Sequence, residues 1–140
     1  VFIAETLTFQ GQKIGYLMYN AFTLDFDSQL NAAFGQFKSD GVSELILDLR
    51  YNGGGAVETA IDLSSMITGQ FNGDLFVSEQ WNADRQAQYA EPKLFDNQIS
   101  SGEGINSLNL NRVYVLTSSR SASASELVIN GLNPYINVMR

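Results

Sequence analysis

The sequence predicts an α/β fold, because two strand–loop–helix units follow one another along the chain. Residues 43–49 and 111–118 are short, nearly continuous apolar runs, which are typical of parallel strands covered on both faces. Each run leads through a loop of small residues into a segment of helical periodicity, at 56–68 and 122–132. Right-handed crossovers would join the two units into one parallel sheet.

Further elements are expected before the first unit. Residues 1–22 contain two β-branched and aromatic runs broken by the turn sequence QGQK, which indicates a hairpin. A helix should follow, capped by Asp25 or Asp27 and ending near Ser39. Its apolar stripe consists of Phe26, Leu30, Ala33, Phe34 and Phe37.

The stretch between the two units has the weakest pattern. Residues 74–81 can form a strand, whereas 82–106 lack a hydrophobic period and predict a surface excursion with little regular structure or high mobility. Residues 135–140 resemble the start of one more strand. The apolar strand residues expected to be buried are Leu45, Ile46, Leu47, Val113, Val115 and Leu116.

Composition excludes several classes of function. The net charge is −7, and the eight Lys and Arg residues are spread along the chain, so we expect no nucleic-acid partner. Cysteine and histidine are absent, which excludes disulfides and thiolate metal sites and removes the usual base of a Ser-His-Asp triad. We therefore expect neither a metal nor a cofactor. No apolar run approaches the ~18 residues of a transmembrane helix.

The loop after the first buried strand, RYNGGG, can expose backbone N–H groups, because Gly53, Gly54 and Gly55 carry no side chains. It matches neither the phosphate-binding P-loop nor the dinucleotide fingerprint. A simple tight turn between a strand and a helix is the commoner explanation of three consecutive glycines.

The loop after the second buried strand contains five serines between Ser118 and Ser125. Two interpretations of it are equally compatible with the spacing. Ser123 and Glu126 fit a capping box, in which Ser123 is the helix N-cap. Alternatively, a serine at a helix N-terminus can act as a nucleophile, with the next amide, that of Ala124, and the helix dipole stabilising an oxyanion.

Taken together, LILDLRYNGGG and VYVLTSSRSASASELVINGL resemble the C-terminal processing, or tail-specific, serine protease family. The resemblance covers most of the chain except about 70–110. It implies a crotonase/Clp-protease-like core of βαβ units, truncated before its last strands. Residues 1–140 would then be part of one peptidase catalytic domain, without the PDZ-like module and without the segment that carries the base.

The resemblance also implies roles for individual residues. Ser123 would be the nucleophile, and the oxyanion hole would combine the amide of Ala124 with that of Gly54 or Gly55. The base of the family is a lysine in a Gly-Lys segment some two dozen residues after the serine, beyond Arg140. The lysines of this chain, Lys13, Lys38 and Lys93, do not lie in such a segment, so the chain alone is expected to be inactive. Tyr51 and Gly53 depart from the usual Asn and Pro of the first loop.

The resemblance further implies a polypeptide substrate, cleaved near its C-terminus, and export to the periplasm or cell envelope. Two rival hypotheses remain beside a serine peptidase. One is a non-catalytic relative of the crotonase-like fold that binds small apolar ligands or a partner protein. The other is a structural α/β domain in which the serines only cap a helix.

Overall fold

Five strands form one mixed sheet in the computed structural model, which describes residues 2–78 and 92–140. Their order in the sheet is β1-β2-β3-β6-β7; β1 runs antiparallel to β2, and the other neighbours are parallel. The predicted α/β class with βαβ units is confirmed. The strands are β1 (Phe2–Phe9), β2 (Gln12–Tyr19), β3 (Glu44–Asp48), β6 (Arg112–Leu116) and β7 (Asn137–Met139).

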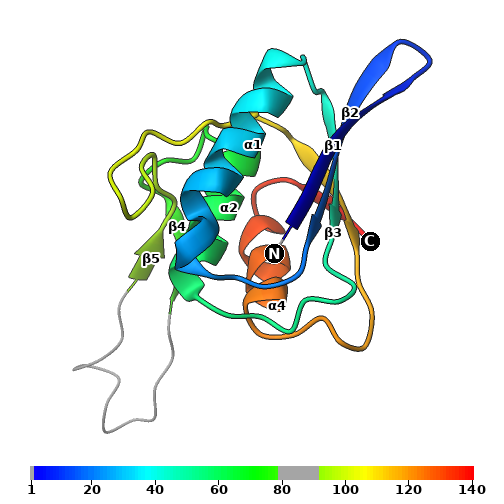
Figure 1. Cartoon of the computed structure of the whole chain (residues 1–140). Helices are drawn as coiled ribbons and strands as arrows, with labels where there is room; N and C mark the ends of the chain where they lie inside the picture. Colours follow the sequence, from blue (N-terminus) through cyan, green and yellow to red (C-terminus); the bar gives the residue numbers. More distant parts are fainter. Residues whose placement is uncertain (1, 79–91) are drawn as a thin grey trace, which may run out of the picture.

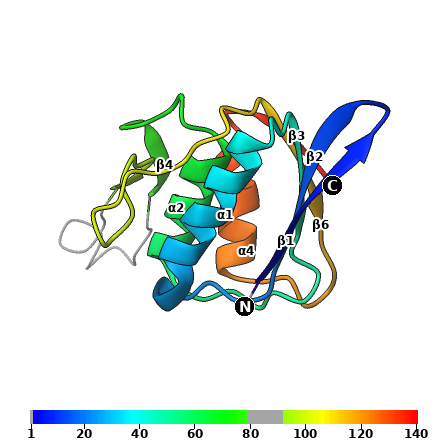
Figure 2. The same ribbon diagram turned by 45° about the horizontal axis from the view of Figure 1, so that its top comes forward.

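The helices of the described residues lie together on one face of this sheet (Figure 1, Figure 2). From β2 to β7, each parallel strand is added on the same side of the previous one. Right-handed crossovers therefore place each connecting helix on the same face. The helices are α1 (Asp27–Ser39), which follows a short 3-10 helix η1 (Leu24–Phe26), α2 (Val57–Ile67) and α4 (Ala124–Leu132).

The predicted hairpin is formed by β1 and β2. Its turn residues Gln10 and Gly11 both have positive φ, 51° and 79°, which is the two-residue turn that matches the twist of paired strands. The expected helix over 27–39 is also present, but its cap is not. Neither Asp25 nor Asp27 caps it, because the N-cap residue is Phe26 and no side chain bonds to the helix end. Asp27 instead points into the protein and is 3% exposed.

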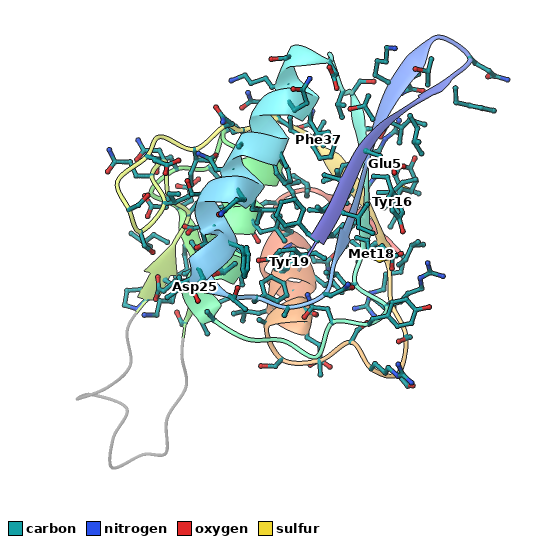
Figure 3. All side chains as sticks on the ribbon, in the orientation of Figure 1. Glu5, Tyr16, Met18, Tyr19, Asp25 and Phe37 are labelled. Carbon is teal, nitrogen blue, oxygen red and sulfur yellow. The ribbon has the colours of Figure 1, made fainter. Side chains whose placement is uncertain are left out.

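The two faces of the sheet differ in their cover. Leu45, Leu47, Val113 and Val115 face the helices and are at most 2% exposed. Ile46, however, is only half-buried and Leu116 is 38% exposed, so the prediction that these strands are covered on both faces is wrong for the described residues. Tyr16 and Met18 point away from the helices, whereas Tyr19 and Phe37 point into the helix-covered layer (Figure 3). Only one face of the sheet is covered by the described residues because all the crossover connections between its parallel strands lie on the same side.

The excursion between α2 and β6 is fixed to the helix layer. The expected strand at 74–81 appears as β4 (Leu75–Ser78), which pairs with β5 (Pro92–Leu94); residues 79–91 lie outside the described part. Of the excursion predicted for 82–106, residues 92–106 contain one short strand and loops, as expected. They are nevertheless anchored, because Phe95 and Ile99 are buried.

Aromatic rings join this excursion to α4. The ring of Phe76 lies 5.2 Å from that of Phe95, which in turn lies 5.0 Å from Tyr135, just after α4. Phe76 also covers Gly131 so closely that a β-carbon there would lie 2.5 Å from Phe76 Cζ. The absence of a side chain at Gly131 therefore allows the excursion to pack on the helix.

Within residues 2–78 and 92–140, no helix combines the length and apolar character needed to span a membrane.

Gly131→Ala should destabilise the protein, because the new methyl group collides with Phe76. Overpacking costs about 1–3 kcal/mol, and the better helix propensity of alanine offsets up to about 1 kcal/mol of this. Urea denaturation measures the net loss. Gly104→Ala is the matched control, since a β-carbon at Gly104 meets no atom within 4 Å. Equal stability of the two variants would contradict the close packing of Phe76 on Gly131.

Candidate active site

The glycine loop and the serine loop meet at the carboxyl ends of the adjacent parallel strands β3 and β6. Gly54, with φ of 110°, lies directly against the start of α4. A β-carbon on Gly54 would lie 2.6 Å from Ser123 Cβ, 3.0 Å from Ala122 O and 3.1 Å from Ala124 N. Only glycine permits this approach, which brings the two loops singled out in the sequence into contact.

Ser123 precedes the first residue of α4 and is exposed. Its backbone has φ of 55° and ψ of −114°, a conformation that costs a non-glycine residue about 1–3 kcal/mol. Its side chain forms no cap hydrogen bond, so the capping-box interpretation of Ser123 and Glu126 is wrong. Because helix capping does not account for this serine, the strained backbone needs another explanation.

The neighbouring serines have structural contacts. Ser121 Oγ donates to Leu49 O at 2.6 Å and accepts from the Ser118 amide at 3.1 Å, which is a turn role. Ser118 Oγ donates to the carbonyl of Arg50. Ser125 does not lie on the helix surface; it is fully buried, and its Oγ donates to Asn52 O at 3.0 Å. The first turn of α4 rests on the glycine loop at this position, which is why Ser125 faces inward.

Asn52 is the residue that fixes the glycine loop. It is 0% exposed, and its Nδ2 donates to Tyr19 O at 2.9 Å while its Oδ1 accepts the amide of Gly54 at 2.8 Å. Its carbonyl also accepts from the Ala122 amide at 3.3 Å, in addition to Ser125 Oγ. One side chain and its own carbonyl thus connect the end of β2, the glycine loop and the start of α4.

The candidate oxyanion donors are not equivalent. The amide of Gly54 is already bonded to Asn52 Oδ1. Within the described residues, the amides of Gly55 and Ala124 donate to no protein group. Gly55 is held in place because the neighbouring backbone groups bond to Phe22: Phe22 N to Gly54 O at 3.0 Å, and Ala56 N to Phe22 O at 2.8 Å. Two amides therefore remain available to bind an anionic oxygen.

Asp48, at the end of β3, is a carboxylate both of whose oxygens accept hydrogen bonds. Arg50 donates Nε to Oδ1 at 2.9 Å and Nη2 to Oδ2 at 2.8 Å, and Tyr16 OH donates to Oδ2 at 2.6 Å. The hydrogen bonds from Arg50 are the main cause that lowers the pKa of Asp48 to about 2. At neutral pH Asp48 is therefore a poor proton acceptor, and it orients Arg50 at the start of the glycine loop.

Neither the glycine loop nor the serine loop carries a lysine that could act as a general base. Lys13 lies at the start of β2 and donates to Thr8 Oγ1 at 2.9 Å, and Lys38 is exposed in the last turn of α1. Both positions are at the amino ends of the parallel strands, on the opposite edge of the sheet. Lys93, on β5, lies 3.6 Å from Glu58. Among the described residues, no group of acidic side chains could hold a metal ion.

A serine at the start of a helix, packed against a glycine loop at the carboxyl ends of parallel strands, is an arrangement that suits hydrolase sites built on α/β folds. The comparison with known families agrees with a hydrolase. The family model of peptidase family S41 matches residues 13–135, and the chain belongs to this family.

Two relatives of similar sequence are C-terminal processing proteases. The chain is 25% identical over 122 residues to a carboxyl-terminal-processing protease of Picosynechococcus, covering 87% of this chain and 26% of the relative. It is 29% identical over 121 residues to a chloroplastic C-terminal processing peptidase of Tetradesmus obliquus, covering 86% of this chain and 23% of the relative. The chain thus spans about a quarter of the length of these relatives.

Solved structures have the same fold. An S41 protease of Bacteroides fragilis is 36% identical and superposes with a TM-score of 0.87, covering 97% of this chain and 36% of that one. The photosystem II D1 C-terminal processing protease, at 24% identity and a TM-score of 0.67, covers 95% of this chain and 33% of its own. The second likeness supports the fold alone.

Sequence reasoning found both loops but missed the roles of Asn52 and Tyr16. An asparagine two residues before a glycine in a turn is a recognisable signal, because its side chain can bond to the backbone two residues further on. Its additional bond to Tyr19 O joins residues 33 positions apart and has no local signature. The Tyr16 contact with Asp48 likewise depends on the parallel register of β2 and β3.

Asn52→Ala should loosen the glycine loop. It leaves the Tyr19 carbonyl and the Gly54 amide without their partner, and each unsatisfied buried group costs about 1–3 kcal/mol. We expect a loss of about 2–4 kcal/mol in urea denaturation together with faster amide exchange at Gly54. Asn130→Ala, on the exposed face of α4, is the control and should change stability by less than about 0.5 kcal/mol. Unchanged exchange at Gly54 would refute the anchoring role.

Proposed function

We propose that this chain carries the nucleophile and the oxyanion donors of a serine-type peptidase, with Ser123 as the nucleophile. The observation that carries the proposal is the strained backbone of Ser123, held at φ of 55° against Gly54 at the start of α4. Strain of this kind persists where the surrounding structure enforces it, and it is common at active sites. Membership of peptidase family S41 supports the same assignment.

The proposed chemistry is acyl transfer. Ser123 Oγ attacks the scissile carbonyl carbon and loses its proton to a base, while the carbonyl oxygen becomes anionic. The amides of Ala124 and Gly55 donate to that oxygen, and the N-terminal end of the α4 dipole stabilises its charge. The amine leaves with a proton from the base, and water then releases the acyl group from Ser123. Gly54 contributes through its close packing against Ser123, since its own amide is bonded to Asn52.

The base of the proposed Ser/Lys dyad is a lysine beyond Arg140. A buried lysine whose pKa is lowered by desolvation can accept the proton of a serine. Lys13 and Lys38 lie at the opposite edge of the sheet and Lys93 lies on β5, so none of them is proposed as the base. The chain is then part of a catalytic domain, and a PDZ-like module is expected elsewhere in the protein. The open face of the sheet supports this view, because further structure can cover it.

The proposed substrate is a polypeptide cleaved near its C-terminus. The named relatives are carboxyl-terminal or C-terminal processing proteases, which supports this class. No nucleic acid is proposed as a partner, since the net charge is −7. Export to the periplasm or cell envelope is proposed on the basis of the family resemblance.

A second candidate function is non-catalytic binding of an apolar ligand or a partner protein. The open face of the sheet favours it, because it contains a concavity of about 510 Å³. Its lining residues are Gln12, Ile14, Tyr16, Glu44, Ile46, Arg112, Tyr114 and Leu116. A phosphonofluoridate probe separates the two functions, since it labels an activated serine and leaves a binding module unlabelled.

Ser123→Ala should abolish turnover and probe labelling in the longer protein while leaving folding intact. Because the Ser123 side chain makes no cap hydrogen bond, we expect stability to change by less than about 0.5 kcal/mol. A capping serine would instead lose about 1 kcal/mol and retain activity. Ser119→Ala, an exposed serine of the same loop, is the control and should behave as wild type. Retained turnover in Ser123→Ala would refute the assignment.

Residues 1–140 alone should show little or no cleavage of casein. Without a nearby base, the Ser123 hydroxyl keeps a high pKa and is a poor nucleophile. The measurement compares this chain with the longer protein under the same conditions. Robust cleavage that depends on Ser123 would show that a base lies within the 140 residues.

A further inference from the structure

Two buried carboxyl groups lie together between α1 and α2, since Asp27 accepts a hydrogen bond from Thr59 of α2, and Asp62 lies three residues after Thr59 on that helix and interacts with Asp27. Asp27 is the first residue of α1 and is 3% exposed; Asp62 lies in the middle of α2 and is 4% exposed. The two helices lie side by side in both ribbon views (Figure 1, Figure 2). Among the described residues, neither carboxyl forms an ion pair with a lysine or arginine. A pair of charged carboxylates buried without a cation is unstable.

The contacts of the pair are incomplete if both groups are ionised. Thr59 Oγ1 donates to Asp27 Oδ2 at 3.2 Å, but Asp27 Oδ1 and Asp62 Oδ2 have no donor among the described residues. The hydroxyl of Tyr19, from β2, is 0% exposed and also lacks a partner. Tyr19 projects from the sheet into the helix layer (Figure 3). Polar groups from β2, α1 and α2 therefore converge where no cation balances them.

Two further carboxylates act on Asp62, and one of them, Glu58, lies 3.6 Å from Lys93. Asp96 and Glu58 both act on Asp62 through their charges, and Tyr19 is neutral. Burial, followed by the neighbouring Asp27 carboxyl, raises the pKa of Asp62 to about 8. Burial also raises the pKa of Asp27, although the hydrogen bonds from Thr59 and Asp62 oppose this effect. The surroundings therefore favour a proton on Asp62, while the two hydrogen bonds to Asp27 favour the ionised form of Asp27.

We propose that Asp27 and Asp62 form a buried proton-binding site, in which one carboxyl donates its proton to the other in the folded protein. The shared proton leaves one negative charge on the pair instead of two. The carboxyl that carries this charge is Asp27, which accepts a hydrogen bond from the Thr59 hydroxyl. In a site of low dielectric, a protonated carboxyl forms a strong hydrogen bond with a neighbouring carboxylate. This inference concerns the helix layer and does not depend on the proposed peptidase activity.

The site is connected to the glycine loop by the backbone. α2 begins at Val57, directly after that loop, and Asp62 lies about 1.4 turns further along the helix. The segment between β2 and α1 contains Phe22, which bonds to both Gly54 and Ala56 before the chain reaches Asp27. Loss of the proton would set two like charges against each other at the α1–α2 contact. The loop between these elements would then lose part of its support.

The direction of the pH effect follows from the raised pKa. The folded protein holds a proton that the unfolded chain, with an ordinary aspartate, releases above about pH 4. This contribution to stability is complete at low pH and is lost as the pH rises toward the raised pKa of Asp62, about 8. For one proton, the folding equilibrium constant falls by up to about tenfold per pH unit over that range.

Urea denaturation between about pH 5 and pH 9 tests the site. In Asp62→Asn the side-chain amide donates to Asp27 at every pH. The folding equilibrium constant of this variant should therefore lack the fall of up to about tenfold per pH unit expected for the wild type. Asp96→Asn, which removes a nearby charge outside the pair, should retain the wild-type slope. Amide exchange at residues 53–56 should accelerate with pH more in the wild type than in Asp62→Asn. Parallel stability curves for the wild type and Asp62→Asn would overturn the proposal.

Infrared spectroscopy gives a second, independent measurement that does not require a folded variant. The wild-type protein at neutral pH should show the carbonyl absorption of one protonated, buried carboxyl group. Absence of that absorption would refute the shared proton, even if Asp62→Asn failed to fold.

Discussion

The buried side chain of Asn52 is the contact on which the geometry of the candidate site depends. The side-chain amide donates to the carbonyl of Tyr19, the last residue of β2, and accepts a hydrogen bond from the amide of Gly54. The backbone carbonyl of Asn52 accepts hydrogen bonds from Ser125 Oγ and the Ala122 amide. A single planar amide with both ends satisfied has few alternative positions in a dry interior. The glycine loop is thereby held against the start of α4, and the backbone of Ser123 retains its strained conformation.

The one-sided winding of the sheet places this contact and also explains what is left uncovered. Because the parallel strands are added in one direction, their carboxyl ends align and deliver both loops to the same edge. The same winding puts α1, α2 and α4 on one face and leaves Ile46 and Leu116 on the other. The site and the open face are therefore two consequences of one topology.

Aspartates of this chain show how the surroundings set opposite proton affinities in one residue type. Asp48 accepts bonds from Arg50 and Tyr16, and its pKa is lowered to about 2. Asp62 forms no ion pair with the described residues, and burial, followed by the neighbouring Asp27, raises its pKa. The first aspartate is a fixed charge that orients Arg50, whereas the second retains a proton. Both are almost fully buried, so the difference lies in their partners rather than in their exposure.

The sequence by itself determined the class of fold, the order of its elements and the two loops of the candidate site, because apolar periodicity and small-residue clusters are local signals. Tertiary structure decided what depends on distant residues. The bond between Asn52 and Tyr19, the burial of Ser125 and the pairing of Asp27 with Asp62 each join separate elements. Local patterns also predicted caps at Asp27 and Ser123 that packing replaced with an inward carboxyl and a strained turn. Capping rules consider only neighbours in the chain, whereas burial and strain are set by the whole fold.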